Sequence, residues 1–362
     1  MKIALLGPAS SGHISKISNE LLKRNIDNIV ISLPNHRDEQ NRIKGEIFYL
    51  KYGGGKGYFL NVPQVKKILK KERCDVLNAH YASGYGTLAT WAHFPRTVIS
   101  VWGSDVYSFP YQSKLHRRIL MHVLSHSDLI FSTSECMKKQ TARFLKKEKE
   151  IIVTPLGIDF DLFPFSMPER HVKSFTIGFL KGTDSLYGYD VFLKALRKLI
   201  DEYEALDIRI SAYMCGDSYN QTAFFDLVDH LKLQEYVYYN GAIPHKNMPG
   251  FIQQCDVVCI PSRKESFGVV AIEAMACGRP CVTSDAEGLQ EVMVDGITGY
   301  IFENGNADAC ALQLGRMLKS PDSILKMGCN ARKHVEQHYS FSNNIDQFIK
   351  GYESLVMHGK RK

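Results

Sequence analysis

Short apolar runs alternate with helix-like stretches along most of the chain, and this alternation falls into two series. Strands that alternate with helices pair in parallel, so each series predicts one doubly wound α/β domain. In such domains ligands bind beyond the carboxyl ends of the strands. The expected strands span 3–6, 28–33, 47–50, 75–79, 97–101 and 129–133 in the first series, and 175–180, 208–214, 237–240, 257–260, 280–283 and 299–302 in the second.

A carboxylate stands inside an apolar helix predicted over residues 268–277. Val, Ala, Ile and Met surround Glu273 on every side, so the helix has no polar face and the carboxylate is expected to be buried. Because a buried, unpaired carboxylate strongly destabilises a fold, Glu273 needs a partner. We interpret that partner as a ligand hydroxyl, and a buried arginine or a backbone group is the alternative.

The turn that opens this helix is polar and contains a glycine. Glu265 and Ser266 precede Gly268, which lets another group come close to the backbone. The first N–H groups of a helix have no backbone acceptor, and together with the helix dipole they attract anions. The segment therefore offers a carboxylate, an anion site and a second carboxylate, an order that suits a sugar, a diphosphate and a ribose.

This segment resembles the signature of the family 4 glycosyltransferases, which are retaining enzymes that use nucleotide sugars. The resemblance rests on Pro261-Ser262, Glu265, Ser266-Phe267-Gly268, Glu273-Ala274-Met275-Ala276 and Gly278, and extends to residues 154–159 and to Gly288, Glu291, Asp295-Gly296 and Thr298-Gly299. It implies the GT-B fold, in which two Rossmann-like domains face each other across a cleft.

The resemblance also implies how the chain is divided. Residues 1–155 are expected to form the acceptor-binding domain, and residues 156–340 the nucleotide-sugar-binding domain. Residues 341–362 should contain a helix, at about 344–356, that crosses back to the first domain. The length of 362 residues suits two domains that each bury a core.

Donor-binding residues follow from the same resemblance. The family often supplies two cations for the diphosphate from the first loop of its second domain; in this chain Lys181 supplies one, and Arg263 or Lys264 could add another. The carboxylates keep the roles implied by their order, with Glu265 on the sugar and Glu273 on the ribose. The complete predicted donor set is Gly12, Lys181, Gly216, Ile243, Ser266, Phe267, Gly268, Val269 and Glu273.

Two polar residues of the first domain complete the predicted catalytic set with Glu265. Many relatives carry a histidine that contacts the donor sugar at the position of Trp102. This substitution leaves His80 and Asp105 as candidates near the reacting carbon. The glycine-rich stretch 53–57 lacks the Ser or Thr that a P-loop needs for magnesium, and we interpret it as a mobile loop over the acceptor.

The chemistry implied for such a site is stabilisation of a departing diphosphate. Lys181 and the N–H groups near Gly268 would supply fixed positive potential. Retention without a protein nucleophile lets the departing phosphate take the proton of the incoming hydroxyl. The sequence shows no paired carboxylates for double displacement, and no metal motif, so we expect neither a metal nor another cofactor.

Positive charge is concentrated in the first half. Residues 1–155 carry 24 Lys and Arg against 12 Asp and Glu, whereas residues 156–362 carry 21 against 26. The helix predicted over 65–73 interleaves apolar residues with Lys66, Lys67, Lys70 and Lys71, as an interfacial helix on anionic lipid does. A solvated helix face is the alternative. Nucleic acid is a weaker candidate, because no nucleic-acid-binding motif is visible.

We therefore predict a cytoplasmic enzyme that is peripheral on the inner face of the cell membrane. It transfers a sugar from a nucleotide-sugar donor, which we interpret as a UDP-sugar. Its acceptor would be a lipid-linked or polysaccharide molecule in the synthesis of lipopolysaccharide, capsule or exopolysaccharide. Nine cysteines without a Cys-x-x-Cys pair suit a reducing compartment. The alternatives are a nucleotide-sugar epimerase of the same fold and a non-catalytic carbohydrate- or nucleic-acid-binding protein.

Overall fold

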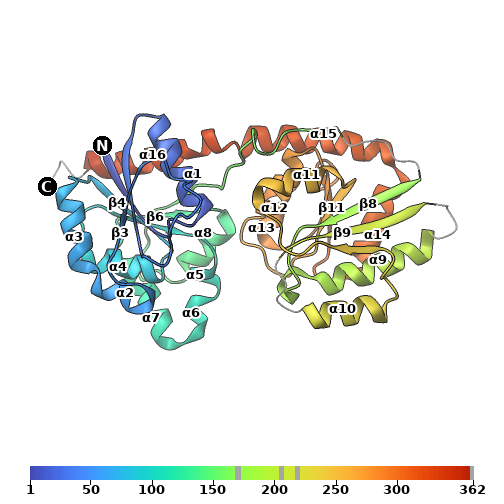
Figure 1. The fold of residues 1–362 in the computed structure, drawn as a ribbon, viewed down its shortest axis with the longest axis horizontal. Helices are drawn as coiled ribbons and strands as arrows, with labels where there is room; N and C mark the ends of the chain where they lie inside the picture. Colours follow the sequence, from blue (N-terminus) through green and yellow to red (C-terminus); the bar gives the residue numbers. More distant parts are fainter. Residues whose placement is uncertain (168–172, 204–207, 217–220, 359–362) are drawn as a thin grey trace. The chain divides into compact units, whose positions relative to one another are not determined.

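The computed structural model describes residues 1–167, 173–203, 208–216 and 221–358. The chain forms two compact units (Figure 1). Residues 1–155 and 342–362 form the N-terminal unit, and residues 156–341 form the C-terminal unit.

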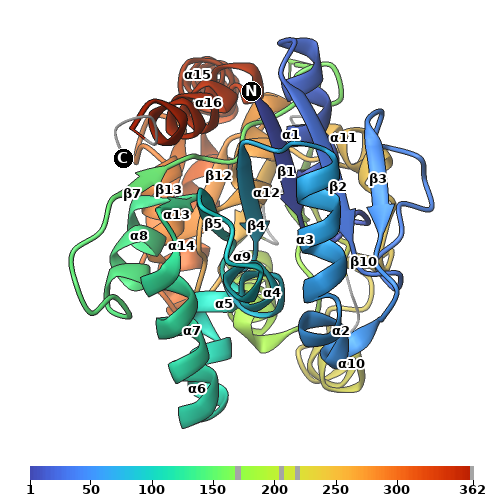
Figure 2. The same ribbon diagram turned by 90° about the vertical axis from the view of Figure 1, so that its left-hand side faces the viewer.

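The N-terminal unit is built on a seven-stranded parallel sheet with the order β3-β2-β1-β4-β5-β6-β7. Figure 2 shows these strands from β7 on the left to β3 on the right. The order reverses between β1 and β4, which is where an open α/β sheet offers a ligand site. The strands are β1 (Lys2–Leu6), β2 (Asp27–Ser32), β3 (Glu46–Tyr49), β4 (Val76–His80), β5 (Thr97–Val101), β6 (Leu129–Ser132) and β7 (Ile151–Val153).

Helices cover both faces of this sheet. Leu77 and Ala79 of β4 share one core with apolar residues of α3, α4 and α7. Asn78 points to the opposite face, where its amide donates to the Tyr352 hydroxyl of α16 at 2.6 Å. The helices are α1 (Gly12–Lys23), α2 (Gly54–Leu60), α3 (Val62–Lys71), α4 (Gly84–Ala92), α5 (Ser104–Tyr107), α6 (Phe109–Gln112), α7 (Lys114–His126), α8 (Glu135–Ala142) and α16 (Phe341–His358).

The C-terminal unit repeats this plan with a six-stranded parallel sheet in the order β10-β9-β8-β11-β12-β13. The order reverses between β8 and β11, so the carboxyl ends of these two strands are the expected ligand position. The strands are β8 (Ser174–Phe179), β9 (Arg209–Met214), β10 (Val237–Tyr239), β11 (Val257–Ile260), β12 (Cys281–Ser284) and β13 (Gly299–Phe302).

Two apolar cores sandwich the second sheet. Val257 and Cys259 of β11 pack with α9 and α14, whereas Val258 and Ile260 pack with α12 and α15 on the other face. The helical segments are η1 (Ser185–Tyr187), α9 (Tyr189–Tyr203), α10 (Gln221–His230), η3 (His245–Asn247), α11 (Met248–Gln253), α12 (Val269–Ala276), α13 (Glu287–Val292), α14 (Ala307–Lys319) and α15 (Pro321–His338).

The predicted fold class is confirmed, since both units are doubly wound parallel α/β sheets, but several local predictions are wrong. The glycine-rich stretch after Tyr52 is not a loop, because Gly54 begins helix α2. Gly57 is required there, since a β-carbon on it would lie 2.4 Å from the Tyr52 carbonyl oxygen. Strand β7 was not predicted.

Helix α3 also differs from the interfacial helix that the sequence suggested. Its apolar residues Val65, Ile68 and Leu69 are buried in the core of the N-terminal unit, and its lysines face solvent. These apolar residues therefore cannot insert into lipid. Among the residues that the structure describes, no helix combines the length and apolar character that crossing a bilayer requires.

Candidate active site

A buried lysine and a glutamate meet at the switch point of the C-terminal unit. Lys181 follows β8, and Glu265 lies in the connection from β11 to α12. The Lys181 Nζ donates to Glu265 Oε2 at 2.8 Å, and the two side chains are 15% and 12% exposed. The sequence predicted that both residues contact a ligand, and the structure pairs them with each other.

The surroundings keep Lys181 protonated. Burial lowers the pKa of its amine, but the charge and hydrogen bond of Glu265, with smaller contributions from Tyr187 and Glu273, raise the pKa overall. The amine also lies 4.7 Å from the centre of the Tyr187 ring, a favourable cation–π distance. A fixed positive charge therefore sits at the carboxyl end of β8, flanked by both candidate carboxylates.

Gly268 opens helix α12 in a conformation that favours glycine, with φ of +96°. A β-carbon at this position would lie 3.0 Å from Val292 and 3.1 Å from Leu289, so the turn is also closely packed. The N–H groups of Val269 and Val270 belong to the first turn, which the carbonyls of the helix itself do not reach. The Phe267 ring is buried beside Tyr339, so only the backbone of Phe267 could meet a ligand.

Glu273 is buried as its apolar surroundings predict, with 5% of the residue exposed. Its Oε1 lies 2.8 Å from Nε2 of His245, whose side chain is 52% exposed. His245 also packs edge-on against Phe163 at 5.3 Å. The sequence did not point to His245, although it lies two positions after Ile243, a predicted donor residue. Because His245 is half exposed, a ligand can approach from solvent and replace it as the partner of Glu273.

Two further predicted donor residues, Gly216 and Ile243, belong to the same unit. Gly216 has φ of +132°, and a β-carbon on it would lie 2.4 Å from the backbone nitrogen of Gly182. Ile243 packs against the apolar core that holds α12. The residue after Gly216, Asp217, lies outside the described residues.

The second cation predicted for the diphosphate is engaged elsewhere. Arg263 forms two hydrogen bonds to the Asp190 carboxylate, at 2.8 and 2.7 Å, and a third to the Ser185 carbonyl. Such a bidentate pair holds the guanidinium in place. Arg263 therefore stabilises the start of α9, and its contact with a diphosphate stays a prediction.

This geometry can bind a diphosphate that carries a hydroxyl-bearing group on each side. Lys181 and the first turn of α12 offer positive potential, and Glu265 offers a hydrogen-bond acceptor beside them. Glu273 offers a second acceptor about one helix turn beyond Val269, the first residue of α12. Carboxylates accept hydrogen bonds from hydroxyl groups, so a sugar and a ribose on either side of the diphosphate find complementary partners. Among the described residues, no group of three or more His, Cys, Asp or Glu side chains is placed to hold a metal ion.

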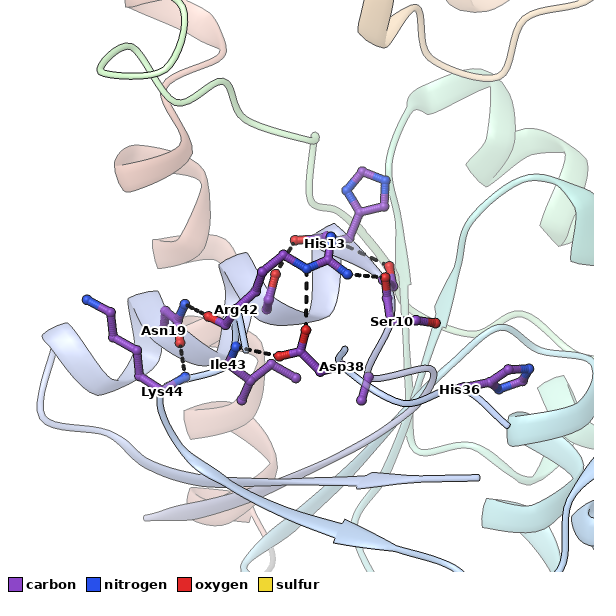
Figure 3. A network of polar contacts seen from close by, with 12 residues as sticks. Ser10, His13, Asn19, His36, Asp38, Arg42, Ile43 and Lys44 are labelled. Carbon is purple, nitrogen blue, oxygen red and sulfur yellow. Dashed lines mark hydrogen bonds and ion pairs between the residues drawn. The ribbon is translucent and has the colours of Figure 1, made fainter. Parts of the chain in front are cut away.

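In the N-terminal unit, the loop after β1 leads into helix α1 at Gly12. Figure 3 shows Arg42 reaching across this start, where it donates to the Ser10 carbonyl and lies 3.5 Å from Asp38. A β-carbon on Gly12 would lie 3.5 Å from Arg42 Nη1. The network fixes the backbone of this loop and leaves a cation beside Gly12.

His80 ends β4 at the switch point of the same unit and is fully buried. Its ring stacks on Trp102 at 5.5 Å, and Trp102 stacks on His13 at 4.9 Å. Within the described part of the chain, neither ring nitrogen of His80 has a hydrogen-bond partner, nor does the indole nitrogen of Trp102. Buried polar groups of this kind favour a bound hydroxyl or water.

Asp105 is also fully buried, but its oxygens are occupied. One oxygen accepts from the Ala82 N–H at 2.8 Å, and the other accepts from the N–H groups of Trp102 and Gly103. Burial raises the pKa of this carboxyl group, although the same N–H groups oppose the rise. The carboxylate holds the loops after β4 and β5 together, which is a positioning role, and its catalytic role stays a prediction.

Burial also makes His80 a determinant of acid stability. It lowers the pKa of the ring from 6.5 to about 3, so below pH 6.5 the unfolded chain takes up a proton that the folded chain does not. Folding stability should therefore fall by about 2 kcal/mol from about pH 7 to about pH 5 through this residue alone. We expect His80→Phe to remove this part of the decrease in urea unfolding measurements at the two pH values.

The matched control is His230→Gln, which changes an exposed histidine on α10. It should leave the pH dependence of the unfolding free energy as in the unmodified chain. A His80→Phe variant with an unchanged pH dependence would contradict the burial argument.

Two family profiles match the sequence. The profile described as Glycosyl transferases group 1 matches residues 167–334, and the profile described as Glycosyl transferase 4-like matches residues 2–134. The two matches lie one in each unit and together span most of the chain.

Curated relatives match across both units at low identity. A D-inositol 3-phosphate glycosyltransferase of Corynebacterium urealyticum is 27% identical over 73% of this chain and 66% of its own length. An N-acetyl-alpha-D-glucosaminyl L-malate synthase of Bacillus anthracis is 24% identical over 82% of this chain and 79% of its own length.

Solved structures match the whole chain. A sucrose-phosphate synthase from Thermosynechococcus elongatus superposes with a TM-score of 0.83 at 19% identity, covering 99% of this chain and 100% of its own. Anabaena HepE in complex with UDP superposes with a TM-score of 0.80 at 19% identity, covering 98% and 100%. The TM-scores establish a shared fold, and at 19% identity the matches establish nothing beyond the fold.

Proposed function

We propose, from the premise that the chain belongs to the group 1 glycosyltransferases, that it transfers a sugar from UDP to a lipid-linked or polysaccharide acceptor. The chain is a glycosyltransferase of the GT-B fold that uses a nucleotide-sugar donor. The finer assignments of nucleotide, stereochemistry and acceptor are proposals. UDP is supported by the UDP complex of HepE, whose fold the chain shares.

One observation carries the donor site, namely the pairing of Lys181 with Glu265 beside the first turn of α12. We place the donor diphosphate between Lys181 and the N–H groups after Gly268. Positive potential that is already in place stabilises the negative charge that develops on the leaving diphosphate. The diphosphate would take over Lys181, and Glu265 would then accept hydrogen bonds from the donor sugar.

Glu273 is proposed to bind the ribose. Its present partner His245 is half exposed and lies on a short 3-10 turn, so a ribose hydroxyl can replace it without disturbing the core. The exchange leaves the buried carboxylate hydrogen-bonded throughout, which avoids the cost of an unpaired buried charge.

Retention of the anomeric configuration is proposed to proceed without a protein nucleophile. The bond between the sugar and the diphosphate oxygen breaks as the acceptor hydroxyl bonds to the same face of the anomeric carbon. The acceptor proton passes to the departing phosphate oxygen. Glu265 is proposed to steady the positive charge that develops on the sugar ring. His80, whose ring nitrogens have no hydrogen-bond partner among the described residues, stays the second predicted catalytic residue.

The acceptor class rests on the basic N-terminal sequence and on a structural neighbour named as a lipopolysaccharide outer core galactosyltransferase. We propose that the enzyme acts in the cytoplasm as a peripheral protein on the inner membrane face. The names of the curated relatives point to a second class, small anionic acceptors such as inositol phosphate or malate. Acceptor-dependent release of UDP separates both classes from an epimerase and from a non-catalytic binding protein.

A thermal-shift screen of nucleotide sugars tests the donor. A UDP-sugar present at about 100 times its Kd should stabilise the fold by about 2.7 kcal/mol. The melting temperature of the protein should then rise by about 5–10 °C. ADP- and GDP-sugars at the same concentration should give a smaller rise. A larger shift with a purine nucleotide sugar would exclude UDP as the donor nucleotide, and no shift with any nucleotide sugar would contradict the donor site.

A further inference from the structure

Three large apolar side chains are exposed together on helices α2 and α4 of the N-terminal unit. Phe59, Leu60 and Trp91 are 43%, 52% and 45% exposed. The rings of Phe59 and Trp91 contact each other edge-on at 5.0 Å, so they form one patch although they lie on different helices. We call these three residues the apolar patch.

The patch lies among segments that carry no acidic side chain. Residues 51–68, 84–93 and 109–126 contain no Asp or Glu. Helix α4 contacts both α2 and α7, and Figures 1 and 2 show α2, α4, α6 and α7 gathered along the lower side of this unit. The basic residues of these segments are Lys51, Lys56, Lys66, Lys67, Lys114, Arg117 and Arg118.

Further exposed apolar groups lie on the neighbouring helices of the same side. Tyr111 at α6 and Leu115 on α7 are 61% and 64% exposed. The apolar residues of α3, in contrast, are committed to the core. Apolar side chains available to an outside partner therefore lie on α2, α4, α6 and α7, while α3 contributes charge.

We propose that this face docks the enzyme on an anionic bilayer, with the apolar patch inserted at the headgroup level. Tryptophan and phenylalanine are favoured at that depth, and lysines close to the surface are attracted by anionic lipid. The proposal rests on the proposed function, since a lipid-linked acceptor would place the enzyme at such a surface.

The composition of this face favours a bilayer over a protein partner. Lysine is depleted from protein–protein interfaces, and their charges are usually paired with opposite charges across the contact. Segments that carry positive charge and no carboxylate instead match a uniform negative surface. A protein partner or a second copy of this chain is an outcome that the experiment below can reveal.

Co-sedimentation of the full chain with extruded vesicles tests the proposal. We expect binding to vesicles of phosphatidylcholine mixed with phosphatidylglycerol, and much weaker binding to phosphatidylcholine alone. The triple variant Phe59→Ser, Leu60→Ser, Trp91→Ser should bind the anionic vesicles roughly 100-fold more weakly, because three partly exposed side chains lose their burial in lipid. Replacing Lys66, Lys67, Lys70 and Lys71 with glutamine should also weaken binding, and added salt should reduce this difference.

The matched control is a triple variant on the C-terminal unit, Phe225→Ser, Ile297→Ser, Leu312→Ser, whose side chains are 42%, 51% and 63% exposed. It should bind the vesicles like the unmodified chain. Equal binding by the patch variant and the unmodified chain would overturn the proposal. No vesicle binding by the unmodified chain would also overturn it, and a concentration-dependent dimer that the patch variant abolishes would then assign the face to a second copy.

A separate readout keeps this proposal distinct from the proposed function. The patch variant should keep the UDP-sugar thermal shift of the unmodified chain, because the patch lies in the other unit. If vesicles bind but no nucleotide sugar shifts the melting temperature, the donor assignment fails and the docking surface stands. If the shift is present but vesicles do not bind, the docking surface fails alone.

Discussion

Replacing Glu265 with glutamine is expected to lower kcat by about 100- to 1,000-fold with a UDP-sugar and its acceptor. The glutamine keeps the size of the side chain but removes the negative charge beside the reacting sugar. It also leaves Lys181 without its 2.8 Å carboxylate partner. Initial rates at saturating donor measure the effect, and urea unfolding separates it from a loss of stability.

The control for this variant is Asp190→Asn, which breaks the pair between Asp190 and Arg263 in the same unit. Arg263 and burial oppose each other at Asp190, and the net effect lowers the pKa of its carboxyl group. Asp190→Asn should therefore reduce stability at neutral pH while kcat stays within a few-fold of normal. Equal losses of kcat in the two variants would show that Glu265 acts only through stability.

Replacing Lys181 with methionine is expected to weaken UDP binding by about 100-fold, because the substitution removes the positive charge that contacts the diphosphate. Uridine, which has no phosphate, should bind the variant and the unmodified chain with the same Kd. Calorimetry with UDP and ligand-observed NMR with uridine provide the two values. The comparison isolates the contribution of the diphosphate.

Lys326→Met is the matched control, since Lys326 is an exposed lysine on α15 of the same unit and was not predicted to contact the donor. It should leave the Kd of UDP unchanged within about two-fold, because an exposed charge contributes little in water. An equal loss of uridine and UDP binding in Lys181→Met would contradict a specific contact between Lys181 and the diphosphate.

The arrangement of strands was the most predictable part of the fold. Strands 97–101, 257–260 and 299–302 begin and end where the apolar runs do, because both faces of a parallel sheet are covered and the runs are continuous. The short strand β7 was missed, because its residues Ile151–Val153 follow a charged stretch. Helix α2 was missed because three of its seven residues, Gly54, Gly55 and Gly57, are glycines, which are weak helix formers.

The candidate site was predictable at the level of residues but not of pairs. Burial of Glu273 followed from the apolar helix around it. Its pairing with His245 did not, because the two residues are 28 positions apart and meet only in the folded chain. The direction of the Arg263 side chain was equally hidden, since its partner Asp190 lies on α9.

A structure of the full chain crystallised with a UDP-sugar tests the donor site most directly. We predict that both ribose hydroxyls contact the Glu273 carboxylate, that His245 has moved away from it, and that the diphosphate lies between Lys181 and the first turn of α12. An intact pair of Glu273 and His245 in that crystal, with the nucleotide bound at any other place, would contradict the account.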